Sequence, residues 1–201
     1  MNIAVFVSGI GSNLNAIINS KELKNLVEVK AVFSDKVDCP AFEIARRNSI
    51  DTFCLGNKED CVGYEQLANQ LKSLKIELIV LAGFLKLIPH IIVREFKNRI
   101  INIHPALLPS FGGKGMYGIH VHESVFKSSA QVSGATVHFI DEEYDKGFII
   151  AQRCVDISNV NSPAEIAERV LEVEHTLLPF VIRKFAEGKI SIKERRVLIQ
   201  G

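Results

Sequence analysis

Short apolar runs punctuate the first hundred residues, and stretches with helical spacing separate them. The strands that we expect cover residues 3–7, 27–33, 51–55, 77–82 and 100–102, and the helical stretches cover 14–20, 40–47, 64–74 and 91–96. Apolar runs of this length are typical of strands that are buried on both faces. Their alternation with helices predicts an α/β fold with a mostly parallel sheet.

The pattern changes after residue 105. A loop rich in proline and glycine covers 105–118, and a short helix is expected over 122–127. Two further strands are then predicted, followed by a long helix that begins at Pro163; these elements cover 136–140, 148–155 and 163–185. The acidic turn DEEYDKG between the two strands favours an antiparallel hairpin. With no internal repeat or linker, we expect one domain over residues 1–201.

Composition excludes several classes of protein. The formal net charge is +1, so no global basic field attracts nucleic acid. No apolar run is long enough to span a bilayer, and the amino terminus does not resemble a signal peptide. The four cysteines show neither a CxxC pair nor a zinc pattern, which favours single thiols acting as small apolar fillers in a reducing compartment. We therefore expect a cytoplasmic protein that uses neither nucleic acid nor a membrane as partner.

A turn of small residues, GIGSN at 9–13, lies directly after the first strand and directly before a helix. Backbone N–H groups at a helix amino terminus bind phosphate well, and glycine lets the backbone approach closely. A plain strand-to-helix turn capped by Ser12 or Asn13 explains the same residues. The dinucleotide fingerprint is incomplete, because Leu14 stands where the third glycine is required.

Polar side chains follow the fifth apolar run. Asn102 and His104 are two residues apart at the end of a strand, so their side chains point the same way. The carboxyl edge of a parallel sheet is where α/β proteins bind ligands, and an amide beside an imidazole can stabilise an oxygen that gains charge. Asp145, in the acidic turn, is the carboxylate that we expect to raise the pKa of His104 above that of free imidazole. Satisfied polar groups at a strand end are the structural alternative.

His120 and His122 form an HxH pair that suggests metal ligands beside His104. No carboxylate or third ligand stands at a recognised zinc spacing, so we expect no metal site. The glycine-rich stretch over 112–118 is interpreted as a mobile loop.

Four segments together carry a family resemblance: GIGSNLNAII at 9–18, LAGFLKLI at 81–88, INIHPALLPSFGGKGMYGIHVH at 101–122 and SGATVHFIDEEYDKGFIIAQ at 133–152. Their order resembles that of the phosphoribosylglycinamide formyltransferases, folate-dependent enzymes of purine synthesis. The resemblance extends to RVLEVEHTLLP at 169–179 and so covers nearly the whole chain. It implies a single-domain, Rossmann-like formyltransferase fold, with a parallel amino-terminal half and a mixed, partly antiparallel carboxyl-terminal half of the sheet.

The resemblance also implies roles for individual residues. Residues 1–100 would form the phosphate-binding half, and residues 101–201 the catalytic and folate-binding half. The implied catalytic residues are Asn102, His104 and Asp145. The implied acceptor-binding residues are Gly11, Ser12, Asn13, Leu14, Asn15 and Glu174. The implied folate-binding residues are Leu85, Lys86, Leu87, Ile88, Asn102, Asp141, Glu142, Glu143, Tyr144 and Asp145.

Three positions depart from the family pattern. Ile10 replaces an Asn between the two glycines, and Lys86 stands where an Arg is frequent. Near Cys61, some members carry an Arg that contacts the folate tail, and this chain has none, so the resemblance does not imply that contact here. None of these departures alters the implied catalytic set.

The implied reaction moves the formyl group of 10-formyltetrahydrofolate onto the amine of glycinamide ribonucleotide, without metal, in a monomer or homodimer. One alternative is a formyltetrahydrofolate hydrolase, which would be expected to carry an added domain before the first strand. Transfer to initiator tRNA would require an RNA-binding domain and a basic face. A non-catalytic sugar-phosphate-binding module explains GIGSN but gives no reason for Asn102, His104 and Asp145 to occur together.

Overall fold

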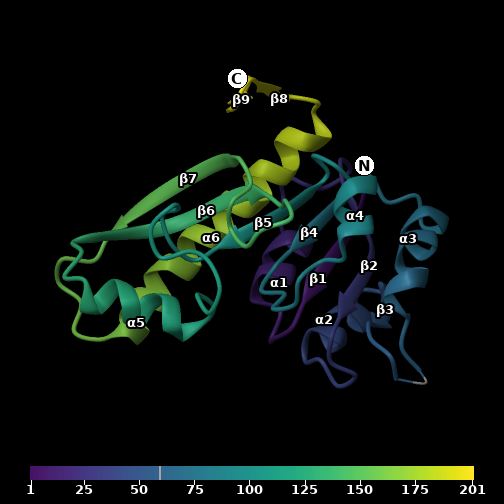
Figure 1. Cartoon of the computed structure of the whole chain (residues 1–201), viewed down its shortest axis with the longest axis horizontal. Coiled ribbons are helices and arrows are strands. Elements are labelled where there is room, and N and C mark those ends of the chain that lie inside the picture. The colour runs from purple at the N-terminus through teal and green to yellow at the C-terminus, as the bar shows by residue number, and fades with distance from the viewer. Residues whose placement is uncertain (59) are drawn as a thin grey trace. The chain divides into compact units, whose positions relative to one another are not determined.

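A computed structural model describes residues 1–58 and 60–201. Its main sheet has seven strands in the order β3-β2-β1-β4-β5-β6-β7, and a separate two-stranded sheet contains β8 and β9. The chain divides into two compact units, Met1–Ile101 and Asn102–Gly201. Strand β5 (Ile100–His104) contributes residues to both of them (Figure 1). The predicted α/β class, with a parallel first half and an antiparallel hairpin later, is confirmed, whereas the single-domain organisation stays a prediction.

The first unit alternates strands and helices as the apolar runs predict. Its elements are β1 (Asn2–Val7), α1 (Ser12–Ile18), β2 (Glu28–Ser34), α2 (Ala41–Arg47), β3 (Asp51–Cys54), α3 (Tyr64–Ser73), β4 (Leu78–Leu81) and α4 (His90–Glu95). Strand β1 pairs in parallel with both β2 and β4, and β2 pairs in parallel with β3. The side chains of Ile3 to Val7 are fully buried, as expected of a central strand covered on both faces.

The second unit is built on a long antiparallel hairpin. Its elements after β5 are α5 (Ile119–Lys127), β6 (Val132–Phe139), β7 (Ile149–Asp156), α6 (Pro163–Ala186), β8 (Ile190–Lys193) and β9 (Arg196–Ile199). Helix α6 packs against β6 and β7, and α5 packs against α6. The long helix starts at Pro163 because Ser162 caps it, with its hydroxyl accepting a hydrogen bond from the Glu165 N–H at 3.3 Å.

Strand β5 is longer than predicted. The expected strand ended at Asn102, but the structure continues it to His104. Ile101 and Ile103 are 0% and 5% exposed, so they fill the core on one face, while Asn102 and His104 occupy the other. The polar residues are therefore part of the strand and are held by its backbone.

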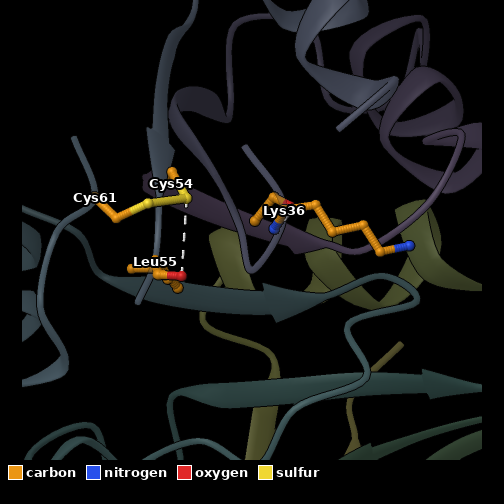
Figure 2. The surroundings of a disulfide bond; sticks show 5 residues. Lys36, Cys54, Leu55 and Cys61 are labelled. Carbon is orange, nitrogen blue, oxygen red and sulfur yellow. Dashed lines mark hydrogen bonds between the residues drawn. A yellow bond between two sulfur atoms is a disulfide. The ribbon is translucent and has the colours of Figure 1, made fainter. Parts of the chain in front are cut away.

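Two of the four cysteines depart from the expected free thiols. Cys54 and Cys61 form a disulfide, with their Cα atoms 4.6 Å apart (Figure 2). Cys39 is a free, buried thiol, as predicted for a small core residue, whereas Cys154 is free but exposed. The bond was not predicted because the sequence spacing of the two cysteines resembles no known pair motif.

None of the helices within residues 1–58 and 60–201 combines the length and the apolar character that a membrane crossing requires.

Candidate active site

The polar face of β5 begins a cluster of side chains in the second unit. Asn102 is half-buried and His104 is buried, with 3% of its surface exposed. The Nε2 atom of His104 lies 2.8 Å from the carbonyl oxygen of Phe111 in the loop after β5. A carbonyl oxygen only accepts hydrogen bonds, so this nitrogen carries a hydrogen. His104 is thus held with Nε2 as a donor.

Asp145 reaches the cluster from the turn between β6 and β7. Its Oδ2 atom lies 3.8 Å from Nδ1 of His104, and its Oδ1 atom lies 3.5 Å from Nε2 of His138. The Gly113 N–H donates to Oδ2 at 2.8 Å. The structure therefore brings Asp145 within ion-pair distance of the predicted His104, and of a second histidine that the sequence analysis did not select.

His138 connects Asn102 to Asp145. Its Nδ1 atom donates to the carbonyl oxygen of Phe139 at 2.8 Å, and its Nε2 atom faces the Asn102 amide nitrogen at 3.1 Å. When Nε2 carries no hydrogen, it can accept a hydrogen bond from the Asn102 amide. When Nε2 carries a hydrogen, it can donate to the Asp145 carboxylate. His138 is fully buried on β6. The signal available in the sequence was the alternation of Thr136 and His138 with apolar residues in SGATVHF.

Burial sets the protonation of His104 more strongly than its carboxylate partner does. Burial lowers the pKa of His104 from its ordinary value of 6.5, and Asp145 and the Phe111 carbonyl offset only part of this effect. The expectation of a raised pKa was therefore wrong, because it counted the charge of Asp145 and neglected the loss of water around the ring. The pKa of Asp145 lies below its ordinary value, so this carboxylate is ionised at neutral pH. Burial raises the pKa, but the hydrogen bonds from His138 and Gly113 and the charges of the nearby histidines lower it by more.

The two residues of the HxH pair have different environments. His120 is exposed, and its Nδ1 lies 3.4 Å from Glu123, whereas His122 is only 5% exposed. Burial, and secondarily His104, lower the pKa of His122 to about 4. Within the described residues, 1–58 and 60–201, no group of three or more His, Cys, Asp or Glu side chains could hold a metal ion.

Hydrogen bonds from β6 and β7 fix the loop that follows His104. The Thr136 hydroxyl donates to the Ala106 carbonyl at 2.6 Å and accepts from the Leu108 N–H at 3.1 Å. Gln152, directly opposite on β7, donates to both Thr136 and the Leu108 carbonyl at 2.9 Å. Because this loop carries Phe111 and Gly113, the same bonds position the partners of His104 and Asp145.

The turn after β1 lies in the first unit. Gly11 is the N-cap of α1 with φ 80°, and a Cβ at this position would lie 2.7 Å from the Cβ of Ala41. Both constraints require glycine. Leu14 is fully buried in the core, and Asn15 is exposed. Ile10, within this turn, is 73% exposed.

The predicted folate-binding residues divide between the two units. In the first, Leu85, Lys86 and Leu87 are exposed while Ile88 is buried, and the Leu85 N–H donates to the Ser8 hydroxyl at 3.1 Å. In the second, Glu142, Glu143 and Tyr144 are exposed and Asp141 is half-buried. Asp141 accepts a hydrogen bond from the Glu143 N–H at 2.9 Å, which closes the acidic turn on itself. Glu174 is buried on α6.

Comparisons with known proteins agree over the whole chain. A family model described as formyl transferase matches residues 1–182. The chain is 43% identical to the chloroplastic phosphoribosylglycinamide formyltransferase of Arabidopsis thaliana, over 99% of this chain and 70% of that protein. It is 35% identical to the phosphoribosylglycinamide formyltransferase of Escherichia coli strain K12, over 100% of this chain and 94% of that one. The crystal structure of phosphoribosylglycinamide formyltransferase from Anaplasma phagocytophilum matches with a TM-score of 0.90 at 30% identity, covering 100% and 95% of the two chains.

Proposed function

Because the chain belongs to the phosphoribosylglycinamide formyltransferase family, we propose that it moves a formyl group from 10-formyltetrahydrofolate to the amine of 5'-phosphoribosylglycinamide. The products are phosphoribosyl-N-formylglycinamide and tetrahydrofolate, in the synthesis of purines. The observation that carries the proposal is the cluster in which Asn102, His104 and Asp145 meet around His138. Two hydrogen-bond donors beside an ionised carboxylate suit a reaction that passes through an oxyanion.

The residues of the cluster have distinct parts in this mechanism. The neutral acceptor amine attacks the formyl carbon and forms a tetrahedral oxyanion. Asn102 and His104 donate hydrogen bonds to that oxygen, and a well-placed donor is worth roughly 3 to 4 kcal/mol in such a transition state. The amine loses a proton as its bond to the formyl carbon forms, the departing folate nitrogen gains one, and His104 relays this proton between them. Asp145 favours the charged form of the His104 ring, which burial disfavours.

Other residues are proposed to bind the two substrates. The turn comprising Gly11, Ser12, Asn13, Leu14 and Asn15 would hold the acceptor phosphate, since a glycine N-cap leaves the start of α1 without a competing side chain. Glu174 would contact the sugar or the amine. Leu85 and Leu87, which are 44% and 51% exposed, offer an apolar surface for the folate ring. The acidic turn from Asp141 to Asp145 would complete the folate site.

The cellular setting is part of the proposal. We expect a cytoplasmic enzyme whose partners are its two small substrates, with neither nucleic acid nor membrane involved, and which is a monomer or a homodimer. A net charge of +1 supports this view, because it provides no long-range attraction for nucleic acid.

The decisive assay follows folate release optically, with purified protein, 10-formyltetrahydrofolate and glycinamide ribonucleotide. Release that requires the amine acceptor supports transfer. Release at the same rate without the acceptor would instead establish the alternative, a formyltetrahydrofolate hydrolase. No release under either condition would favour a non-catalytic sugar-phosphate-binding module. His104→Ala should abolish the reaction, and His120→Ala, which changes an exposed histidine outside the cluster, is the matched control.

A further inference from the structure

The Cys54–Cys61 disulfide closes a short loop at the end of β3. Cys54 is the last residue of that strand, and Cys61 precedes Gly63, the N-cap of α3. Figure 2 shows the bond joining the two segments, with the Lys36 side chain running away from the sulfur atoms. Both cysteines are half-buried. A bond between half-buried residues at the start of a helix lies within reach of an attacking thiolate, unlike one enclosed in a core.

Backbone hydrogen bonds hold the two segments together independently of the sulfur atoms. The Val62 N–H donates to the Cys54 carbonyl at 2.7 Å, and the Gly56 N–H donates to the Val62 carbonyl at 3.1 Å. Leu55 and Val62 also form an isolated parallel bridge. These contacts would keep the two thiols close after reduction, so the bond can open and form again without a large rearrangement.

The strand that ends at Cys54 is connected to the turn proposed to bind the acceptor. Cys54 pairs with Ser34 of β2, and the Leu55 N–H donates to the Ser34 carbonyl at 2.7 Å. Ser34 directly precedes Asp35. Asp35 accepts a hydrogen bond from the Ser8 hydroxyl at 2.6 Å, and Ser8 directly precedes the 9–13 turn. A change at the Cys54–Cys61 bond can therefore reach the turn through Ser34 and Asp35, within the same unit.

We propose that Cys54 and Cys61 form a reversible thiol–disulfide exchange site, whose state sets the affinity for the phosphorylated acceptor. The reactant is a dithiol, either a protein or a small molecule. One of its thiolates attacks a sulfur of the pair and forms a mixed disulfide, and its second thiolate then resolves that bond. Two electrons and two protons pass to the pair, which becomes two thiols as the reactant becomes a disulfide. In a reducing compartment, a disulfide is more often a redox sensor than a structural bond.

The chemical part is tested on the purified chain of residues 1–201 in mixtures of reduced and oxidised glutathione. Free thiols are trapped with iodoacetamide, and the cysteine-containing peptides are weighed by mass spectrometry. The expected result is one transition in which Cys54 and Cys61 change together between two thiols and one disulfide, while the buried Cys39 stays a thiol. Alkylation of both residues even with excess oxidised glutathione would overturn the proposal. So would a bond that survives excess dithiothreitol under native conditions, because it would then be structural.

The functional part rests on the proposed function and compares the two states of the wild-type enzyme. Reduction should raise the KM for the acceptor by at least about fivefold, a typical size for coupling between sites. The KM for the folate substrate should change less than about twofold by the same reasoning. Equal acceptor KM values in the two states would overturn the coupling. A total lack of activity would count against the proposed function alone, because the alkylation result does not depend on catalysis.

Variants locate the effect. The double variant Cys54→Ser with Cys61→Ser should show the acceptor KM of the reduced enzyme under every redox condition. Cys154→Ser, which removes the exposed free thiol, should respond as the wild type does. A response that persists in the double variant and disappears in Cys154→Ser would assign the redox chemistry to the wrong cysteines and overturn the proposal. The comparison within the wild type remains decisive if the double variant does not fold.

Discussion

His122 should contribute to the loss of stability of the fold in acid. Its side chain is 5% exposed, and burial, with a smaller effect of His104, lowers its pKa from 6.5 to about 4. The unfolded chain therefore binds this proton more tightly than the folded protein does. The neutral ring contributes its full stability above about pH 6.5, and that contribution is lost as the pH falls towards 4.

The size of the effect follows from the two pKa values. With 6.5 for the unfolded chain and about 4 for the folded protein, linkage gives a loss of about 2 kcal/mol in the free energy of unfolding between pH 7 and pH 5. For a chain of this length, such a loss corresponds to about 4 to 8 °C in Tm.

Urea unfolding at pH 7 and at pH 5 measures this loss in the wild type and in His122→Gln. Other groups also titrate over this range, so the useful quantity is the difference between the two proteins. The variant should lose about 2 kcal/mol less than the wild type on acidification. His120→Gln, which changes the exposed histidine on the same helix, should behave as the wild type does. If His122→Gln loses as much stability as the wild type, the ring is not held neutral by burial and the reasoning fails.

Three further predictions concern the proposed reaction. Asp145→Asn removes the charge beside His104, so NMR titration should show the His104 pKa lowered further. The turnover number should fall at least about tenfold, with smaller changes in either KM, and an unchanged pKa would show that the two groups are not coupled. Gly11→Val places side-chain atoms against Ala41 and should raise the acceptor KM steeply, while folate binding stays nearly normal. An equal loss of affinity for both substrates would mean that the turn is only structural. Dialysis against a chelator should leave the rate unchanged, and activity that disappears and returns with zinc would require another mechanism.

The elements of the fold could be predicted because buried strands leave a clear pattern. Residues 3–7 are apolar without interruption, and this is the signal of a central parallel strand. The last two residues of β5 were not predicted as strand, because Asn102 and His104 interrupt the apolar pattern on the face of the strand that forms the site. A strand that carries functional groups loses the apolar pattern by which strands are recognised.

The site could be predicted only in part. Asn102 and His104 are adjacent on one strand, so their common direction follows from geometry. Their approach to Asp145 depends on the hairpin turn, which sequence spacing does not determine. His138 was missed because a histidine within an apolar strand resembles an ordinary buried residue. The net pKa of His104 required the degree of burial, a property of the folded protein that sequence spacing does not supply.

In the structure, the Phe111 carbonyl oxygen accepts the hydrogen bond from Nε2 of His104. In the proposed reaction, the formyl oxygen takes the place of that carbonyl as the acceptor for Nε2. Exchange of one neutral carbonyl for another changes little in energy, so this hydrogen bond adds almost nothing to ground-state binding. An oxyanion is a much stronger acceptor than either carbonyl. The hydrogen bond from His104 therefore stabilises the transition state more than the bound substrate, because it becomes stronger only when charge develops on the substrate oxygen.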